Sequence, residues 1–496
     1  MNKQAPFSVD GVSIHSKYAP EKQAERFIQN NTDYVSTRTI LVVGDGYGYV
    51  SAAAKNRFPS AKIISIYVSN HQPDFPHSWW NPFQNNPLYA FLRMNLHYSD
   101  LIGLKVLFWP PGCRVLEKNI PSVMEIIHNS IQMNQKELAT IGFFGRQFLL
   151  HAARKIKRTI IGAEHLIARP PIIATSGPSL DSDLPTLKQF RSKIHLNVVS
   201  SALSPLLKAG IIPDSITATD AGFHAAQMLN SLLSHNSNYN LSSIPIICSP
   251  QAAIPSEIQN PIILSGDQNS PEGRLLDSAI SLPIPILGTV TASAFSALKS
   301  AQLQPIFFAG LDLGTHNGKS HAQNHYSQKY SLERNHRFLP LETQSYIRSR
   351  GDSSSLEIYR KWFSSYCDNK AGDLWTSPYS ASNLPKTTVQ QFLNQHPLSN
   401  TIPTSLKNLQ SQDKSLHNTT STTIHLMNEE VRNCLNTWAE TGMLPHYPAA
   451  GLELLVYTAY PALHCKLEDM PRNQAISQAH DDWMRCSNKI SEYQNA

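Results

Sequence analysis

Short apolar runs alternate with stretches of helical spacing through the middle third of the chain. Most of these runs are bounded by glycine, proline, serine or aspartate and are followed by apolar residues three to four positions apart. The predicted strands are residues 172–175, 194–199, 215–219, 244–248, 261–264, 284–287 and 305–312. The alternation predicts an α/β domain over residues 169–351, with a doubly wound, mostly parallel sheet and helices on both faces.

A second, shorter α/β pattern occupies residues 1–120. Its strands are predicted at Thr39–Val43 and Lys62–Tyr67, with the turn Gly44-Asp45-Gly46-Tyr47-Gly48 and a helix between them. A dinucleotide fingerprint requires a third glycine three residues after the second, and an acid at the end of the second strand. Because the spacing is Gly-x-Gly-x-Gly and Tyr67 stands at the acid's position, we interpret this segment as a structural Rossmann-like domain.

Helical spacing dominates the remaining segments. It predicts a helical connector over residues 121–168 and a helical C-terminal domain over residues 352–496. Within the latter, residues 400–423 are rich in Ser, Thr, Asn and Gln, which predicts a loop or linker.

Composition and charge limit the classes of function that this chain can have. The 42 basic and 36 acidic residues give a net charge of +6, which permits an anionic ligand but does not predict a nucleic-acid partner. No apolar run reaches the roughly 20 residues needed to span a bilayer, and no signal-peptide pattern follows Met1. The six cysteines are widely spaced, which argues against a disulfide framework and a cysteine zinc site. We therefore expect a cytoplasmic protein with reduced thiols.

The turn Ser176-Gly177-Pro178-Ser179 joins the first predicted strand of the central domain to a helix over residues 181–191. Unpaired backbone N–H groups at a helix start attract a phosphate, together with the helix dipole. Gly177 permits close approach of a ligand, and Ser179 adds a hydroxyl that binds a ligand or caps the helix. An ordinary strand–turn–helix connection is the alternative, because short glycine motifs are common.

Small and polar residues recur at the predicted strand ends of this domain. They are Ser176, Gly177, Ser179, Ser200, Ser201, Asp220, Gly288, Thr289 and Asp312. Ligands of open parallel sheets bind outside the carboxyl ends of the strands. The repeated placement therefore predicts a nucleotide site at this edge of the sheet.

Three patches of the central domain resemble the motility-associated-factor (Maf) flagellin glycosyltransferases. They are residues 174–181 (ATSGPSLD), residues 201–220, and residues 288–321 with Gly310-Leu311-Asp312-Leu313. The shared domain of that family also resembles archaeal 6-hydroxymethylpterin pyrophosphokinase, and its core is similar to bacterial sialyltransferases. The likeness covers about residues 10 to 340.

The resemblance implies cytoplasmic transfer of a nonulosonic acid, of pseudaminic or legionaminic type, from its CMP carrier to serine or threonine of flagellin. No cofactor is expected beyond this donor substrate. Breaking a CMP–sugar bond requires a bound phosphate leaving group and a base near the acceptor hydroxyl. The Gly177–Ser179 turn, with Ser200 and Ser201, is expected to hold the cytidine monophosphate.

Three residues are candidates for the chemistry. Asp220 and Asp312 each end a predicted strand, and each is a base, a ribose ligand or an ordinary turn-forming aspartate. His321 matches a family position and is the favoured acid or base. A metal site formed by His316, His321 and His325 is the less favoured reading of that loop, so no metal is expected.

Two other function classes remain open. One is an ATP- and Mg²⁺-dependent pyrophosphoryl transferase acting on a pterin alcohol, in which Asp220 and Asp312 hold the metal. The other is a non-catalytic flagellin-binding or assembly factor.

Overall fold

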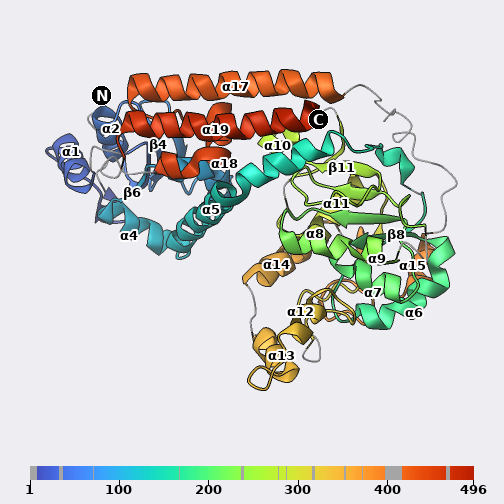
Figure 1. Cartoon of the computed structure of the whole chain (residues 1–496). Coiled ribbons are helices and arrows are strands. Elements are labelled where there is room, and N and C mark those ends of the chain that lie inside the picture. Colours follow the sequence, from blue (N-terminus) through green and yellow to red (C-terminus); the bar gives the residue numbers. More distant parts are fainter. Residues whose placement is uncertain are drawn as a thin grey trace. The chain divides into compact units, whose positions relative to one another are not determined.

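The computed structural model describes most of the chain (Figure 1). The described ranges are residues 8–32, 37–70, 72–166, 168–235, 240–276, 279–285, 287–315, 319–350, 354–370, 372–396, 416–464 and 470–495. Two compact units emerge: one holds residues 1–146 and 424–489, the other residues 147–423 and 490–496. The four-segment division expected from the sequence stays a prediction.

The first unit is built on a small parallel sheet. Its elements are β1 (Ser8–Val9), β2 (Val12–Ser13), α1 (Pro20–Asn31), β3 (Thr39–Asp45), α2 (Tyr49–Arg57), β4 (Lys62–Tyr67), β5 (Ser78–Trp80), α3 (Leu88–Asn95), β6 (Leu104–Phe108), α4 (Pro110–Asn119) and α18 (Ala450–His464), with parts of α5 (Val123–Lys155), α17 (Leu416–Thr441) and α19 (Arg472–Asn495). The sheet order is β5-β4-β3-β6, and β3 is buried along its whole length. Helices α17 and α19 run side by side, and Trp483 Nε1 donates to Asn428 Oδ1 at 2.8 Å (Figure 1).

In the glycine turn of the first unit, the side chain of Asp45 occupies the position that a bound anion would take. Gly44 has a φ of +85°, and a Cβ there would lie 2.6 Å from the Cys113 backbone nitrogen, so the turn requires glycine. The fully buried Asp45 accepts hydrogen bonds from the backbone N–H groups of Gly48 (3.1 Å) and Ser51 (2.8 Å) at the start of α2. The anion position of this turn is therefore occupied by a side chain.

The second unit contains the large sheet. Its strands are β7 (Pro171–Ala174), β8 (His195–Val199), β9 (Ser215–Ala218), β10 (Ile246–Cys248), β11 (Ile262–Gly266), β12 (Ile280–Pro283), β13 (Ile306–Ala309) and β14 (Leu374–Thr376). Its helices are α6 (Leu180–Phe190), α7 (Leu203–Lys208), α8 (Phe223–Leu229), α9 (Ser231–His235), α10 (Pro271–Arg274), α11 (Val290–Ser300), α12 (Ser327–Glu333), α13 (Leu341–Arg350), α14 (Ser354–Asn369) and α15 (Val389–Gln395).

All neighbouring strands of the large sheet are parallel, in the order β12-β11-β10-β9-β8-β7-β13-β14. The chain moves outward from β7 to β12 and then returns to the other side of β7 with β13. This reversal confirms the predicted doubly wound α/β fold. The strands β7, β8, β9 and β13 are buried throughout, which explains their nearly continuous apolar sequences.

Two local predictions were wrong. The strand expected at residues 284–287 lies at Ile280–Pro283, where Ile280 and Leu282 are buried and Ser281 between them is half-buried. Strand β14, which was not predicted, pairs with β13 and extends the sheet beyond residue 351. Of the loop expected at residues 400–423, residues 416–423 belong to α17 and residues 400–415 lie outside the described ones.

No helix within the described ranges combines the length and the apolar character that crossing a bilayer requires.

Candidate active site

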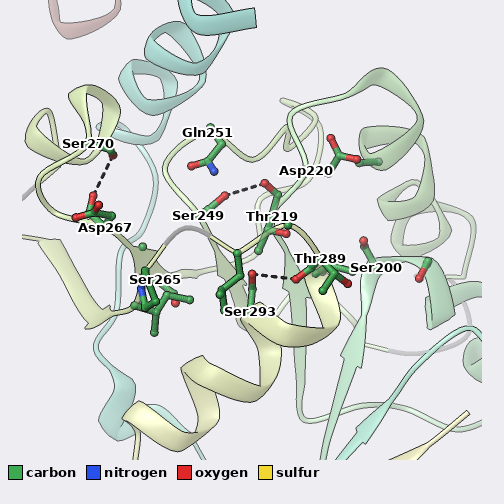
Figure 2. A pocket seen from close by; sticks show the side chains of 18 of the residues that line it. Ser200, Thr219, Asp220, Ser249, Gln251, Ser265, Asp267, Ser270, Thr289 and Ser293 are labelled. Atoms are coloured by element: carbon green, nitrogen blue, oxygen red, sulfur yellow. Dashed lines mark hydrogen bonds between the residues drawn. The ribbon is translucent and has the colours of Figure 1, made fainter. Parts of the chain in front are cut away.

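A cavity of about 400 Å³ lies at the carboxyl ends of β8, β9, β10, β11 and β12 (Figure 2). We call it the strand-tip cavity. Its lining residues are Ser200, Ser201, Thr219, Asp220, His224, Ala225, Met228, Ser249, Gln251, Ser265, Gly266, Asp267, Ser270, Ile284, Pro285, Leu287, Gly288, Thr289, Val290, Ser293 and Tyr359. Parallel strands bring their carboxyl ends to one edge, which is why residues about 90 positions apart meet here.

The start of helix α11 forms one wall of the strand-tip cavity. Thr289 is its N-cap residue: its Oγ1 accepts from Thr291 N–H at 3.3 Å, and its carbonyl accepts from Ser293 Oγ at 3.1 Å. The first N–H groups of a helix lack intrahelical acceptors and carry the positive end of the dipole. This wall therefore favours an anionic group.

The ionisable groups of the cavity are few. Among its described lining residues are two carboxylates, Asp220 and Asp267, and one imidazole, His224, and none is lysine or arginine. A highly charged anion would find no cationic side chain in this lining. The cavity is therefore suited to a ligand with little negative charge, or to an anion that binds together with a metal ion or another cation.

Asp220 and Tyr359 occupy the side of the cavity nearest β9. Asp220 is exposed, and its Oδ1 accepts from Gly222 N–H at 2.8 Å. Tyr359 OH donates to the Gly288 carbonyl at 2.6 Å, which ties α14 to the turn before α11. Burial raises the pKa of Tyr359, and the negative charge of Asp220 raises it further. The phenol therefore stays protonated and serves as a hydrogen-bond donor.

Two side chains of helix α5 form hydrogen bonds with backbone carbonyls of the loop that follows β10. Lys155 is buried, and its ammonium donates to the carbonyls of Pro250 (2.9 Å) and Ala252 (2.6 Å). The ring of His151 bonds the Gln251 carbonyl through Nδ1 at 2.9 Å. Burial lowers the pKa of Lys155 to about 8. These bonds fix the segment from which Gln251 faces the cavity.

Comparisons with known proteins agree with this architecture. Residues 147–318 match the family model described as 6-hydroxymethylpterin diphosphokinase MptE-like. The structure of the MAf glycosyltransferase from Magnetospirillum magneticum AMB-1 is similar, with a TM-score of 0.54, 12% identity, and coverage of 99% of this chain and 84% of that one. The chain has the Maf fold and an MptE-like domain. An uncharacterized protein of Treponema pallidum (strain Nichols) is 28% identical over 326 residues, which cover 62% of this chain and 68% of the relative.

The predicted phosphate turn of the MptE-like domain does not face the strand-tip cavity. Gly177 N–H donates to the Gly310 carbonyl at 3.0 Å, and a Cβ at Gly177 would lie 2.3 Å from that oxygen. Asp312 accepts from the backbone N–H groups of Ser179 and Ala381, each at 2.8 Å. The anion position at the start of α6 is therefore occupied by Asp312, which is 4% exposed.

A second buried carboxylate lies beside this turn. Asp183 accepts from Gly310 N–H at 3.0 Å and from the hydroxyl of Ser377. Burial raises the pKa of Asp183 to about 7, and the nearby charge of Asp312 contributes. Polar side chains thus fill the space near the ends of β7 and β13, where the order of the strands along the chain reverses.

Ser176 is connected to the cavity through one hydrogen bond. Ser201 Oγ donates to Ser176 Oγ at 3.0 Å, and the Ser176 carbonyl accepts from Ala322 N–H at 2.9 Å. Ser176 therefore links the cavity wall to the loop that carries the predicted catalytic histidine.

His321 is half-buried and stacks on His325, with ring centroids 4.0 Å apart. Burial lowers the pKa of His325 to about 3, and the charge of His321 lowers it further. His321 is not among the residues lining the cavity, and His316 lies outside the described residues. Within the described ranges, no group of three His, Cys, Asp or Glu side chains is arranged to hold a metal ion.

The structure thus divides the predicted site. Ser200, Ser201, Asp220, Gly288 and Thr289 line one cavity. Ser176 lies behind its wall, and Gly177, Ser179, Asp312 and His321 lie elsewhere. The catalytic and binding roles of all these residues stay predictions.

Several residues of the cavity were not predicted from the sequence. They are His224, Ser249, Gln251, Ser265, Asp267 and Tyr359. Ser249, Ser265 and Asp267 follow or end strands, so the strand-end criterion applied to every strand would have found them. His224 lies in the first turn of α8 and Tyr359 lies on α14, and neither belongs to a recognisable motif.

Proposed function

We propose that the protein is a glycosyltransferase that moves a nonulosonic acid, of pseudaminic or legionaminic type, from its CMP carrier to serine or threonine of flagellin. The observation that supports this most is the strand-tip cavity, which combines a helix N-terminus with a lining poor in cationic side chains. It lies within a fold similar to that of a Maf glycosyltransferase. The donor and the acceptor follow from the sequence resemblance.

The charge of the cavity favours a CMP-sugar over a nucleoside triphosphate. The phosphodiester of a CMP-sugar carries one negative charge, whereas a triphosphate carries several. A helix N-terminus offers the equivalent of roughly half a positive charge. With two carboxylates in the lining, that is enough to orient a diester but not to neutralise a triphosphate without a metal ion.

The proposed chemistry assigns a task to each wall. The start of α11 binds the phosphate, and its dipole stabilises the charge that develops as the sugar–phosphate bond breaks. Asp220 and His224, on the β9 side, are the proposed acceptors of the proton of the acceptor hydroxyl. The buried Asp312 holds the adjacent turn in shape.

Ligand-induced stabilisation tests the proposal. The melting temperature of the full chain is measured with CMP, CTP or ATP, each with and without Mg²⁺, because a ligand of the folded state raises it. A shift with CMP that does not depend on Mg²⁺ supports the proposal. The direct test is the intact mass of flagellin from cells with and without this protein. An unchanged mass would reject flagellin as the acceptor.

The MptE-like match favours a second candidate, an ATP- and Mg²⁺-dependent pyrophosphokinase acting on 6-hydroxymethylpterin. In that case Asp220 and Asp267, the two carboxylates of the cavity, would be the metal ligands. Asp312 is ill placed for this role, since each of its oxygens accepts a backbone hydrogen bond. Stabilisation by ATP only with Mg²⁺ would favour the kinase, and no shift with any nucleotide would favour a non-catalytic flagellin-binding factor.

A further inference from the structure

The strand-tip cavity has two chemically different ends. Figure 2 shows Asp267 and Ser270 on one side and Asp220 and Ser200 on the other, with Thr289 between them. The Asp220 end also contains His224 and is the end suited to proton transfer. The opposite end, at the tips of β10 and β11, contains side chains suited to hydrogen-bond recognition. We call it the β10–β11 subsite, and it consists of Gln251, Ser265 and Asp267.

Ser265 carries an unsatisfied polar group at this end of the cavity. Its side chain is 3% exposed, lines the cavity, and its Oγ has no hydrogen-bond partner among the described residues. A buried hydroxyl without a partner is energetically unfavourable, so such groups are usually satisfied by a ligand or water. By contrast, the neighbouring Ser249 Oγ donates to the Thr219 carbonyl at 2.9 Å.

Asp267 provides an acceptor beside this hydroxyl. Its Oδ1 accepts from Asn269 N–H at 2.9 Å, and no hydrogen bond within the described residues engages its second oxygen. Gln251 adds an amide, with both donor and acceptor atoms, on the loop that Lys155 holds. The subsite thus offers a carboxylate acceptor together with hydroxyl and amide donors.

This combination matches the edge of cytosine. The exocyclic amino group at C4 is a donor, and the ring N3 and the carbonyl O2 are acceptors. A carboxylate accepting from the cytosine amino group is a recurrent pairing in protein–nucleic acid recognition. Resting on the glycosyltransferase function proposed above, we propose that the β10–β11 subsite recognises the cytosine of the donor and that Asp267 determines the selectivity for cytosine over uracil.

Uracil tests this assignment at the edge of the base. It has a carbonyl oxygen at C4, which would face the acceptor-only carboxylate of Asp267, and its N3 is a donor where that of cytosine is an acceptor, whereas the O2 carbonyl, the ribose and the phosphate of UMP are the same as those of CMP. Two facing acceptors repel each other, and the unpaired polar groups add a desolvation cost. The wild-type protein is therefore expected to bind CMP at least about tenfold more tightly than UMP.

The experiment measures the dissociation constants of CMP and UMP by titration calorimetry, for the wild-type full chain and for Asp267→Asn. The asparagine retains an oxygen for Asn269 N–H, so the turn is preserved, and places an amide group where the second carboxylate oxygen was. That amide donates to the C4 carbonyl of uracil and not to the amino group of cytosine. The CMP preference should fall to within about threefold or reverse. Circular dichroism checks that the variant is folded.

Asp220→Asn is the matched control, because it removes the other carboxylate of the same cavity. Its ratio of CMP to UMP affinity should equal that of the wild type. Ser265→Ala should weaken both nucleotides by about tenfold, because the proposal assigns its hydroxyl to the O2 carbonyl, which the two bases share.

The outcomes separate this inference from the function it rests on. An Asp267→Asn protein that keeps the wild-type CMP preference overturns the assignment of Asp267. So does an equal loss of CMP and UMP affinity, which would place a ribose hydroxyl at the carboxylate. If the wild-type protein binds neither nucleotide, the glycosyltransferase proposal itself fails.

Discussion

The backbone N–H of Ser179 donates a 2.8 Å hydrogen bond to Oδ2 of Asp312, at the start of helix α6. Asp312 Oδ1 accepts from Ala381 N–H at the same distance, so both oxygens are engaged. The carboxylate therefore serves the turn in the manner expected of a bound phosphate. In the first unit, Asp45 does the same at the start of α2.

Replacing Asp312 by asparagine should destabilise the protein. The amide retains one acceptor, so one of the two backbone N–H groups would face an NH₂ group in a buried position. We expect the free energy of unfolding to fall by about 2 kcal/mol, measured by urea denaturation. Asp181→Asn is the control, since the half-buried Asp181 accepts only from Gln323 N–H among the contacts resolved and an amide oxygen can do the same. Equal stability of the two variants would contradict the structural role of Asp312.

Asp183 should make the protein less stable as the pH rises. The folded state retains its proton up to a pKa of about 7, whereas the unfolded chain releases it near 4. Between these values the folded state binds more protons, so the free energy of unfolding falls with increasing pH. Asp183→Asn cannot titrate and should be more stable than the wild type at pH 8, by roughly 4 kcal/mol, and close to it at pH 4. Parallel pH profiles for the two proteins would rule out this titration.

Lys155→Met should weaken nucleotide binding without a direct ligand contact. It removes the donors to the Pro250 and Ala252 carbonyls, which fix the loop that carries Gln251. We expect the dissociation constant of CMP to rise about tenfold in the folded variant, since misplaced polar groups lose about 1 kcal/mol or more. Lys157→Met, at an exposed position on the same segment, should bind like the wild type. A CMP affinity that is the same in both variants would show that the loop needs no support from Lys155.

Two histidines are candidates for the catalytic base. His224 lines the strand-tip cavity, whereas His321, favoured from the sequence, stacks on His325. We expect His224→Gln to lower the rate of sugar transfer by about a hundredfold, with CMP affinity near that of the wild type. His321→Ala should lower the rate less. The reverse order of the two effects would restore the base to His321.

The sequence was informative where burial dictates residue type. The strands β7, β8, β9 and β13 were found because both faces of a parallel sheet are covered, which produces apolar runs with clear ends. The three-residue β14 and the displaced β12 were missed or misplaced, because neither has a pattern long enough to set its limits.

The sheet edge at which the cavity lies was predicted, but the full set of residues that line it was not. Strand-end residues such as Ser200 and Asp220 were found because the sheet topology alone brings them together. The contact between Asp312 and the Ser179 N–H could not be predicted, because a glycine turn looks the same in sequence whether a ligand or a distant side chain occupies it. Tyr359 could not be found, since only tertiary packing carries α14 to the cavity.

The scarcity of cationic side chains in the described cavity lining also bears on turnover. Once the sugar departs, the phosphodiester becomes a monoester, whose second ionisation lies near pH 6. The spent nucleotide therefore gains negative charge at neutral pH, close to Asp220 and Asp267. Under the proposed reaction, the chemical step itself weakens retention of the leaving group and promotes its release, so the cavity empties for the next donor.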